Sequence, residues 1–554
     1  MTEQSIAQPI EKSSKSGLAP STIRIGKRYR ANRLNGDYDA IIIGSGIGGL
    51  TAAACLSSLG YKVLVLEQHY TAGGFTHSYS RNGYEWDVGV HYIGDVGVKT
   101  TLARRLFDFI SGNQLQWQAM DPCYDRIHLG DDHFDLVAGR DNFRNNLVKR
   151  FPQEQAAIDE YIVRLGKVAD AMQLFTVERM LPKPIAKLSK LVRGRVQPSY
   201  FNQTTRQVLE QLTSNQTLIA YLTGQWGDNG MMPAESSFLI HALIAKHYIY
   251  GGYYPIGGAS QMAETIIPQI QKTGGEVFTY AAVEKILLEQ GKAVGVRMKD
   301  GTDIHSPIII SNAGVFNTFN RLLPSDIVQK TGYTQKMKQV KPSMASLCLY
   351  IGIKETSESL KLPKTNFWIY PNENYEQSIK TFLADAKTDI PMVYISFPSA
   401  KDPSFAARYP DRSTIEIVAP CPWEWVEQWA DKPWGKRGDD YDALKEAFSQ
   451  RLLEKLYEKM PHLRGKVDYY ELSTPLSTQF FCWYEKGEIY GLDHDPKRFE
   501  QTWLRPKTDI DGLYLTGQDI MTCGVVGAMI GGLMTAVSIG GIKALPLAKK
   551  IFVG

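Results

Sequence analysis

The sequence has few cysteines and no metal-binding pattern built from them. Its six cysteines stand far apart, and no Cys-x-x-Cys pair occurs. This spacing argues against a disulfide framework and a cysteine zinc site, and it favours reduced thiols. His494 lies between Asp493 and Asp495, but one histidine is too few for a metal site. We therefore expect no metal, and no Ser/His/Asp triad is recognisable.

The chain also lacks a strong charge of one sign. Its formal net charge is +4 over 554 residues, and residues 1–36, with seven basic and two acidic side chains, account for all of it. The remaining body is close to neutral, which argues against a nucleic-acid-binding domain. We expect residues 1–36 to form a disordered basic tail that can meet an anionic membrane surface.

Long hydrophobic runs are nearly absent. The first 20 residues are polar and contain no apolar core of a secretory signal, so we expect a cytoplasmic protein. One stretch without charge, residues 524–541, is long enough to resemble a membrane span. Glycine and hydroxyl side chains weaken its apolar character, and it follows a predicted buried strand. We interpret it as a core helix, with a transmembrane helix as the alternative.

A glycine turn between two apolar runs is the strongest motif present. Residues 37–44 predict a buried strand, residues 50–59 a helix, and residues 61–67 a second strand that ends in an acid. The turn between the first strand and the helix reads Gly44-Ser45-Gly46-Ile47-Gly48-Gly49. This order is typical of a dinucleotide-binding βαβ unit, with a turn that binds no ligand as the alternative.

Each part of this unit has a physical role. Gly44 allows the tight turn, Gly46 lets the backbone approach a pyrophosphate, and Gly49 lets the helix pack on the strand. The helix N-terminus presents free N–H groups to the phosphates. Glu67 stands where an acid binds the adenosine ribose, and a carboxylate there disfavours a 2′-phosphate. FAD or NAD is therefore expected rather than NADP.

Further glycine-rich blocks lie at residues 70–94, 253–312 and 511–519. Each combines short apolar runs with glycine turns, as expected of backbone that wraps a large flat ligand. These blocks favour FAD over NAD.

The blocks define a predicted division of the chain. We expect an α/β (α+β) fold with a discontinuous Rossmann-type FAD-binding domain and an inserted substrate lobe of antiparallel sheet plus helices. The FAD-binding domain takes residues 37–100, 251–324 and 476–554, and the substrate and membrane-facing lobe takes residues 101–250 and 325–475. The first of these insertions reads as mostly helical, and the second contains alternating segments typical of antiparallel strands.

One segment of the predicted lobe, residues 179–209, has seven basic residues and no acid. Apolar and basic side chains fall on opposite faces of a helix: Leu181, Ile185, Leu188 and Val192 against Lys183, Lys187 and Lys190. Such a helix can lie in a membrane interface, and an ordinary surface helix is the alternative. With the tail, this segment predicts peripheral contact with a membrane.

Taken together, these motifs resemble the phytoene desaturase and carotenoid isomerase superfamily of flavoproteins, and within it the retinol saturase subfamily. The resemblance rests on the glycine turn, Leu66-Glu67-Gln68-His69, Ala72-Gly73-Gly74, Gly89-Val90-His91-Tyr92-Ile93-Gly94, Gly251-Gly252-Tyr253-Tyr254-Pro255, Gly257-Gly258, Ser311-Asn312-Ala313-Gly314, Tyr490-Gly491, Asp493-His494-Asp495, Leu515-Thr516-Gly517-Gln518-Asp519 and Cys523-Gly524. It covers nearly the whole chain after residue 36.

Two features depart from the family. Many relatives have an arginine soon after the double glycine, where this chain reads Phe75-Thr76-His77. The vertebrate members also begin with an apolar anchor, which is not seen here, so we expect peripheral contact rather than stable insertion.

The resemblance implies the cofactor site. Ser45, Gly46, Gly48 and Gly49 would hold the FAD pyrophosphate, Gly74 and Phe75 would pass the ribityl chain, Val283 would meet the adenine, and Asp519 would bind the ribityl or phosphate end. The helix after Gly527 would stabilise negative charge on the flavin. The implied cofactor residues are Gly44, Ser45, Gly46, Ile47, Gly48, Gly49, Glu67, Gln68, Gly74, Phe75, Val283, Gly517, Asp519 and Gly527.

The resemblance also implies the chemistry. A flavin gives a hydride to one carbon of a polyene double bond and a protein group protonates the other, so an apolar substrate such as a retinoid, carotenoid or related lipid is expected. His91 and Tyr92 are the candidate proton donors, with a packed loop residue as the alternative for His91. No second dinucleotide motif indicates the electron donor, which could be NAD(P)H, a protein or a quinone.

Two other functions stay open. One is a carotenoid cis–trans isomerase or desaturase that uses FAD. The other is a binding protein for lipidated partners, like the Rab GDP-dissociation inhibitors. The intact glycine turn, Glu67 and Gly517-Gln518-Asp519 argue against it, since a scaffold without flavin does not need them.

Overall fold

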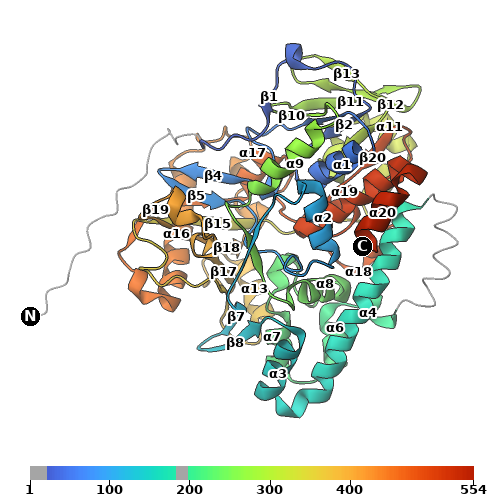
Figure 1. Ribbon diagram of the computed structural model, residues 1–554. Helices are drawn as coiled ribbons and strands as arrows, with labels where there is room; N and C mark the ends of the chain where they lie inside the picture. The colour runs from blue at the N-terminus through green and yellow to red at the C-terminus, as the bar shows by residue number, and fades with distance from the viewer. Residues whose placement is uncertain (1–20, 182–197, 554) are drawn as a thin grey trace, which may run out of the picture.

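The computed structural model describes residues 21–181 and 198–553 (Figure 1). Two large sheets organise these residues. In Figure 1 a parallel sheet and its helices form the upper part, a mixed sheet lies at the left and centre, and helices α3, α4 and α6 extend below. The predicted α/β architecture, with a Rossmann-type unit and a second sheet, is confirmed.

The six-stranded sheet is parallel throughout. Its order is β1 (Lys27–Arg28), β10 (Glu276–Thr279), β3 (Val63–Leu66), β2 (Ala40–Ile43), β14 (Ile309–Ser311) and β20 (Leu513–Leu515). Apart from the edge strand β1, these strands are short and mostly apolar because helices or a second sheet cover both faces. Alternate residues enter different cores: Ile42 and Val65 pack with helices on one face, whereas Ile43 and Leu66 pack on the other.

Helices α1 (Ile47–Ser58), α9 (Gln261–Gln271) and α19 (Gly524–Gly540) contribute to the core on the first face, with α2 (Leu102–Ser111) and α20 (Leu545–Phe552) beside them. The other face is covered by a three-stranded sheet and short helices: β11 (Val283–Glu289), β12 (Lys292–Met298), β13 (Asp303–His305), α10 (Val315–Asn320), α11 (Ser325–Lys330) and α12 (Tyr333–Met337).

The predicted disordered tail is wrong for residues 21–36. Strand β1 pairs with β10 at the edge of the parallel sheet, and the Tyr29 N–H donates to the Thr279 carbonyl at 2.8 Å. Basic side chains of this segment find partners in the body, since Arg24 lies over the Tyr70 ring and Lys27 pairs with Glu276. The backbone of this stretch is therefore held to the sheet, whereas its basic side chains stay exposed at the surface. Lys12 and Lys15 lie outside the described residues.

The second large sheet has seven strands. Their order is β19 (Val467–Ser473), β15 (Ser346–Ile353), β18 (Ser413–Pro420), β17 (Val393–Ser396), β16 (Asn366–Tyr370), β7 (Cys123–Leu129) and β8 (Asp132–Val137). The sheet is mixed rather than purely antiparallel, because β16 and β7 run parallel. The first insertion, predicted as mostly helical, contributes the β7–β8 hairpin to it.

Helices cover both faces of this second sheet. One core contains α3 (Arg140–Arg150), α4 (Gln155–Met180), α6 (Thr205–Glu210), α7 (Gln216–Thr223) and α8 (Phe238–Tyr248), the opposite face carries α16 (Asp439–Lys459), and α13 (Tyr375–Ala384) contributes to both cores. The remaining short elements are β4 (Ser78–Arg81), β5 (Tyr84–Asp87), β6 (Trp117–Ala119), β9 (Tyr253–Pro255), α14 (Pro398–Lys401), α15 (Phe405–Arg408), α17 (Pro475–Cys482) and α18 (Pro496–Glu500).

Helix α19 is the predicted core helix. Gly524–Phe552 is long and apolar enough to cross a membrane by length and composition alone, and among the described residues it is the one such segment. In the structure α19 packs against α1 so closely that a Cβ on Gly532 would stand 2.4 Å from the Gly48 carbonyl oxygen. Its central residues Met529, Leu533 and Met534 are fully buried. This packing places α19 within the core beside the glycine turn.

Candidate functional site

One continuous cavity runs from the glycine turn of the parallel sheet to the seven-stranded sheet. Its wall near the parallel sheet includes Gly44, Gly46, Gly48, Glu67 and Val283, and its wall at the other sheet includes Cys348, Trp368, Met392, Tyr394 and Val418. The cavity therefore joins a predicted nucleotide end to an apolar end.

Eleven of the sixteen predicted site residues line this cavity: Gly44, Gly46, Ile47, Gly48, Glu67, Gln68, Gly74, Phe75, His91, Val283 and Asp519. The other five, Ser45, Gly49, Tyr92, Gly517 and Gly527, are not on its wall. The fold thus brings most of the predicted site residues to one cavity, although their motifs are far apart in the sequence.

The glycine turn forms a cradle of bare backbone. Gly44 has φ of 97°, a left-handed conformation that favours glycine. A Cβ on Gly49 would lie 2.3 Å from the Gly44 carbonyl oxygen, and a Cβ on Gly74 would lie 2.8 Å from the Gly46 Cα. Two glycine loops thus approach at the N-terminus of α1, where free N–H groups point toward the cavity. This cradle fits a dinucleotide pyrophosphate.

Glu67 links the second strand to the turn. One oxygen accepts hydrogen bonds from the Ser45 N–H at 2.8 Å and the Ser45 hydroxyl at 2.7 Å, and the other accepts from the His69 N–H at 2.8 Å. The Ser45 oxygen in turn accepts from the Gly73 N–H. Ser45 is fully buried behind the turn and connects the two glycine loops, whereas Glu67 reaches the cavity wall.

At the far side of the turn, Asp519 and the start of α19 reach the cavity. One Asp519 oxygen accepts from the Val315 N–H at 2.8 Å, and burial raises the pKa of this carboxyl while Arg498 opposes the rise. Helix α19 begins at Gly524, three residues before the predicted start at Gly527, so Gly524, Val525 and Ala528 face the cavity. Gly527 packs on Thr522 instead, where a Cβ would stand 2.3 Å from a carbonyl oxygen.

The apolar end of the cavity is one row of side chains across four strands. Trp368 pairs with Tyr394, Tyr394 with Val418, and Val418 with Cys348. Residues at paired positions point to the same face of a sheet, so the four side chains form a continuous wall. The Trp368 and Tyr394 rings are 4.5 Å apart between centroids. This wall suits an elongated apolar molecule.

The next row on the same face is polar. It lies two residues along each strand and contains Asp125, Asn366, Ser396 and Glu416, all fully buried. The Lys401 ammonium donates to Ser396 at 2.7 Å and to the Asn366 side chain. Burial lowers the pKa of Lys401 to about 7, and burial raises the pKa of Glu416 to about 8.

His91 lies between this polar row and the cavity. Its Nδ1 contacts Glu416 Oε2 at 2.8 Å, and its carbonyl oxygen accepts from the Lys401 ammonium at 2.9 Å. Burial, with the nearby Lys401 charge, lowers the pKa of His91 to about 3. The ring is therefore neutral at physiological pH, and its exposed side-chain fraction of 18% faces the cavity.

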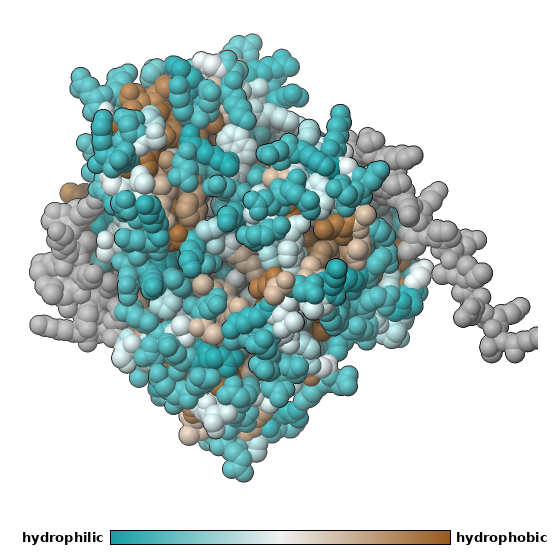
Figure 2. Space-filling model, turned by 180° about the vertical axis from the view of Figure 1, so that it is seen from behind, coloured by the Kyte–Doolittle hydropathy of each residue, from teal (hydrophilic) through white to brown (hydrophobic). Residues whose placement is uncertain are grey.

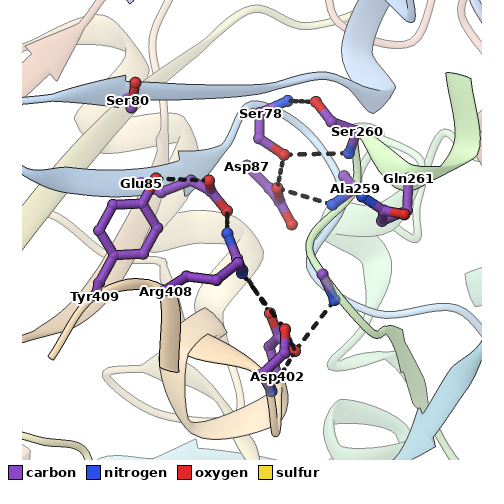
Figure 3. Close-up of polar contacts among 12 residues, drawn as sticks. Ser78, Ser80, Glu85, Asp87, Ala259, Ser260, Gln261, Asp402, Arg408 and Tyr409 are labelled. Atoms are coloured by element: carbon purple, nitrogen blue, oxygen red, sulfur yellow. Dashed lines mark hydrogen bonds and ion pairs between the residues drawn. The ribbon is translucent and has the colours of Figure 1, made fainter. Parts of the chain in front are cut away.

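A hairpin fixes the loop that carries His91. Strands β4 and β5 pair, and Asp87 at the end of β5 accepts from the Ser78 hydroxyl at 2.6 Å and the Ala259 N–H at 3.0 Å (Figure 3). Figure 3 also shows Arg408 between Glu85 and Asp402, with N–O distances of 2.5 and 2.6 Å. These bonds tie the hairpin to α9 and to the α14–α15 segment, and so hold His91 over the polar row.

Tyr92, predicted as a candidate proton donor, is not on the cavity wall. It is 6% exposed and stacks on Tyr248 at 4.1 Å between ring centroids. Its hydroxyl donates to Asp125 at 2.8 Å and also contacts Asp228 at 3.2 Å. Of these, Asp228 lines the cavity.

Sequence reasoning missed the polar row and Asp228. Glu416 could have been noticed, because it interrupts the apolar strand Ser413–Pro420 at a position that faces inward. No local sequence motif marks the other four residues, because each comes from a separate element and they meet only in the tertiary fold: Asp125, Asn366, Lys401 and Asp228.

The fold and the cavity define a dinucleotide-binding oxidoreductase. Residues 42–109 match the NAD(P)-binding Rossmann-like domain. The chain is 38% identical over 530 residues to the all-trans-retinol 13,14-reductase of Rattus norvegicus. The aligned region covers 92% of this chain and 87% of that protein. The protein therefore belongs to the all-trans-retinol 13,14-reductase family.

More distant similarities agree with this placement. The chloroplastic prolycopene isomerase of Arabidopsis thaliana is 27% identical over 538 residues, 95% of this chain and 86% of that protein. The crystal structure of an oxidoreductase from Methanosarcina mazei has a TM-score of 0.60 and 18% identity, and it covers 89% of this chain and 98% of that one. The latter similarity supports the fold.

Proposed function

We propose that this protein binds FAD in the cavity and saturates one carbon–carbon double bond of a long lipophilic polyene, such as a retinoid, carotenoid or related lipid. The observation that carries the proposal is the continuity of the cavity, which joins the glycine cradle and Glu67 to the wall of Trp368 and Tyr394. When bound, reduced FAD supplies a hydride.

The chain supplies the rest of the site. The glycine cradle and the start of α1 would hold the pyrophosphate, Glu67 would accept from the adenosine ribose, and Val283 would lie along the adenine. Asp519 and the N-terminus of α19 would face the flavin end, where a positive helix end stabilises negative charge. The apolar row would exclude water and orient the polyene.

A second function, an FAD-dependent carotenoid isomerase, is favoured by the 27% identity to a prolycopene isomerase. Both functions use the same cavity, and they differ in whether the product gains hydrogen. An electron donor, either NAD(P)H or another reductant, is required only for net reduction.

We also propose peripheral contact with a membrane, because a polyene substrate partitions into lipid. Within the predicted segment 179–209, Arg179 is buried against backbone carbonyls and Arg206 pairs with Glu376, so neither charge is presented to lipid. Residues 182–197, with Lys183, Lys187 and Lys190, lie outside the described residues. On the face in Figure 2, hydrophilic residues predominate and apolar ones form small separate patches. Liposome flotation that is unchanged after charge reversal at the three lysines would contradict contact through this segment.

The enzymatic proposal is tested by reconstitution and mass. The purified protein should bind FAD and be yellow. Anaerobic incubation of the reduced holoprotein with all-trans-retinol or a carotenoid should give a product heavier by two hydrogens. An isomer of unchanged mass would support the isomerase, and a protein that cannot bind FAD would exclude both.

A further inference from the structure

The cavity wall carries three carboxyl groups among the described residues, and they differ in their partners. Glu67 and Asp519 accept hydrogen bonds from backbone N–H groups. Asp228 contacts the Tyr92 hydroxyl, and no hydrogen bond from the described chain reaches its other oxygen. Asp228 is also the carboxyl at the apolar end, where Gly227, Trp368 and Tyr394 line the same cavity.

The backbone brings Asp228 to this position. It ends the short 3-10 helix Trp226–Asp228, and a Cβ on Gly227 would stand 2.5 Å from both Met392 and Trp368. Glycine at position 227 therefore lets the helix backbone lie directly on the apolar row. The Cys523 thiol donates to the Asp228 carbonyl at 3.5 Å and adds a contact from the segment before α19.

The hydrogen-bond partners of Asp125 and Asp228 favour a proton on Asp228. The Tyr92 hydroxyl has a single proton and lies 2.8 Å from Asp125 and 3.2 Å from Asp228. Asp125 accepts three donors, from Tyr92, Gln225 at 2.6 Å and Asn366 at 2.9 Å, which is the pattern of an ionised carboxylate. The Tyr92 proton belongs to this shorter bond. Asp228 is then left with the longer 3.2 Å contact to the Tyr92 hydroxyl as the one hydrogen bond of its carboxyl in the described chain, too little to stabilise a buried anion, which favours a protonated Asp228.

The electrostatic surroundings favour the same state. Burial first, and then the Asp125 charge, raises the pKa of Asp228 well above its ordinary value. The titratable and charged groups around it are Tyr92, Asp125, Tyr248, Tyr370, Tyr394, Tyr490, Cys523 and, beyond Asn366, Lys401. The Lys401 ammonium compensates Asp125 through Asn366, and no ion pair between a basic side chain and Asp228 occurs in the described chain.

We propose that Asp228 is the general acid of the reaction and delivers its proton to one carbon of the polyene double bond. This inference rests on the proposed reductase function. The Asp228 O–H bond would break as a C–H bond forms at one carbon, and FAD, when bound and reduced, would supply the hydride and the two electrons for the other carbon. Asp228 is left as a carboxylate and regains a proton from water after the product leaves. His91 is excluded as the store of this proton because it is neutral and bonded to Glu416.

Tyr92 has a positioning role in this scheme. It is not on the cavity wall, and its hydroxyl contacts both Asp125 and Asp228, which fixes the position of the Asp228 carboxyl. The neighbouring Asp125 charge disfavours a second anion, so Asp228 is returned to its acid form after each turnover.

The test uses the infrared C=O absorption of protonated carboxyl groups, which does not depend on turnover. Difference spectra of wild type against Asp228→Asn should be recorded at pH 6, where Lys401 is charged and the other protonated carboxyls, such as Asp87 and Glu416, are present in both proteins and cancel. We expect a carboxylic acid band that is absent in D228N, and that moves to higher frequency in Tyr92→Phe because the hydrogen bond between Tyr92 and Asp228 is removed. The exposed Asp131 provides the control, since D131N should remove no such band.

Turnover completes the test. D228N should retain FAD but reduce all-trans-retinol about 10²–10⁴-fold more slowly, the usual contribution of a general acid. If wild type reduces retinol, two results would overturn the inference and leave the proposed function intact. One is a near wild-type rate in D228N, and the other is the absence of a carboxylic acid band from Asp228. A band at Asp228 in a wild-type protein that reduces no polyene would instead overturn the proposed function, and the acid role with it.

Discussion

At the scale of single residues, Glu67 is the side chain on which both the turn and the cofactor depend. It accepts three hydrogen bonds from Ser45 and His69, and it also lines the cavity. Glu67→Ala should lower the free energy of unfolding by about 1–3 kcal/mol, because buried donors lose their acceptor. It should also weaken FAD binding about tenfold or more, since the ribose loses its carboxylate.

Ser45→Ala is the matched comparison, because Ser45 stays off the cavity wall. FAD titration followed by flavin fluorescence should show a much smaller loss for this variant. Equal FAD affinity of Glu67→Ala and wild type would contradict the placement of the ribose carboxylate.

Gly49 tests the cradle in the same way. A methyl group there would press on the Gly44 carbonyl oxygen at 2.3 Å, so Gly49→Ala should cost at least about 2 kcal/mol and abolish FAD binding. Gly166 lies inside α4 with nothing within 4 Å of a Cβ, so Gly166→Ala should stabilise the protein by about 0.5–1 kcal/mol. Thermal unfolding of both variants distinguishes a crowded glycine from a merely flexible one.

At the scale of elements, the hairpin β4–β5 positions His91 through charged contacts. Arg408 bridges Glu85 and Asp402 with two separate N–H groups, a geometry that lysine cannot reproduce. Arg408→Lys should therefore lower stability by about 1–2 kcal/mol. Arg297→Lys, in a half-exposed pair with Asp303, should change stability by less than about 0.5 kcal/mol. Similar melting temperatures for the two variants would contradict this role.

The polar row gives a prediction of pH dependence. Burial raises the pKa of Glu416 to about 8, whereas an unfolded glutamate titrates near 4.5. The folded state therefore holds this proton more tightly, and the resulting stability is fully present below about pH 4.5 and lost as pH rises through 8.

Glu416→Gln keeps the shape of the protonated side chain and removes this titration. The variant should gain stability relative to wild type as pH rises from about 4.5 to 8, by an amount on the order of a few kcal/mol. Lys401 and Asp87 titrate in both proteins but are coupled to Glu416, so the difference reports Glu416 together with its effect on these two neighbours. Denaturation curves with a constant difference across this range would show that Glu416 is ionised in the folded protein.

Sequence patterns predicted elements well where the signal is local. The βαβ unit, the glycine turn and the alternating strands of the second insertion follow from short motifs and alternation. The start of α19 was placed three residues late because glycines at 524 and 527 look alike in sequence, and only packing on Thr522 separates them. Strand β1 was missed because two basic residues give no strand signal, and its pairing with β10 comes from the tertiary fold.

At the scale of the whole molecule, the two sheets build one cavity from segments far apart in the chain. The parallel sheet provides the glycine cradle, and the seven-stranded sheet provides an apolar row above a polar one. The cofactor end could be predicted because its residues belong to recognisable motifs. The substrate end could not, because Asp125, Asn366, Lys401 and Asp228 come together only when β7, β16, α14 and the 226–228 helix assemble.

The central claim is that flavin and polyene react within this one cavity. The direct measurement is an anaerobic titration of the chemically reduced holoprotein with all-trans-retinol, in which flavin absorbance and product mass are followed together. The account predicts that oxidised flavin returns in equal amount to a product two hydrogens heavier. A polyene that changes geometry while the flavin stays reduced would contradict net reduction.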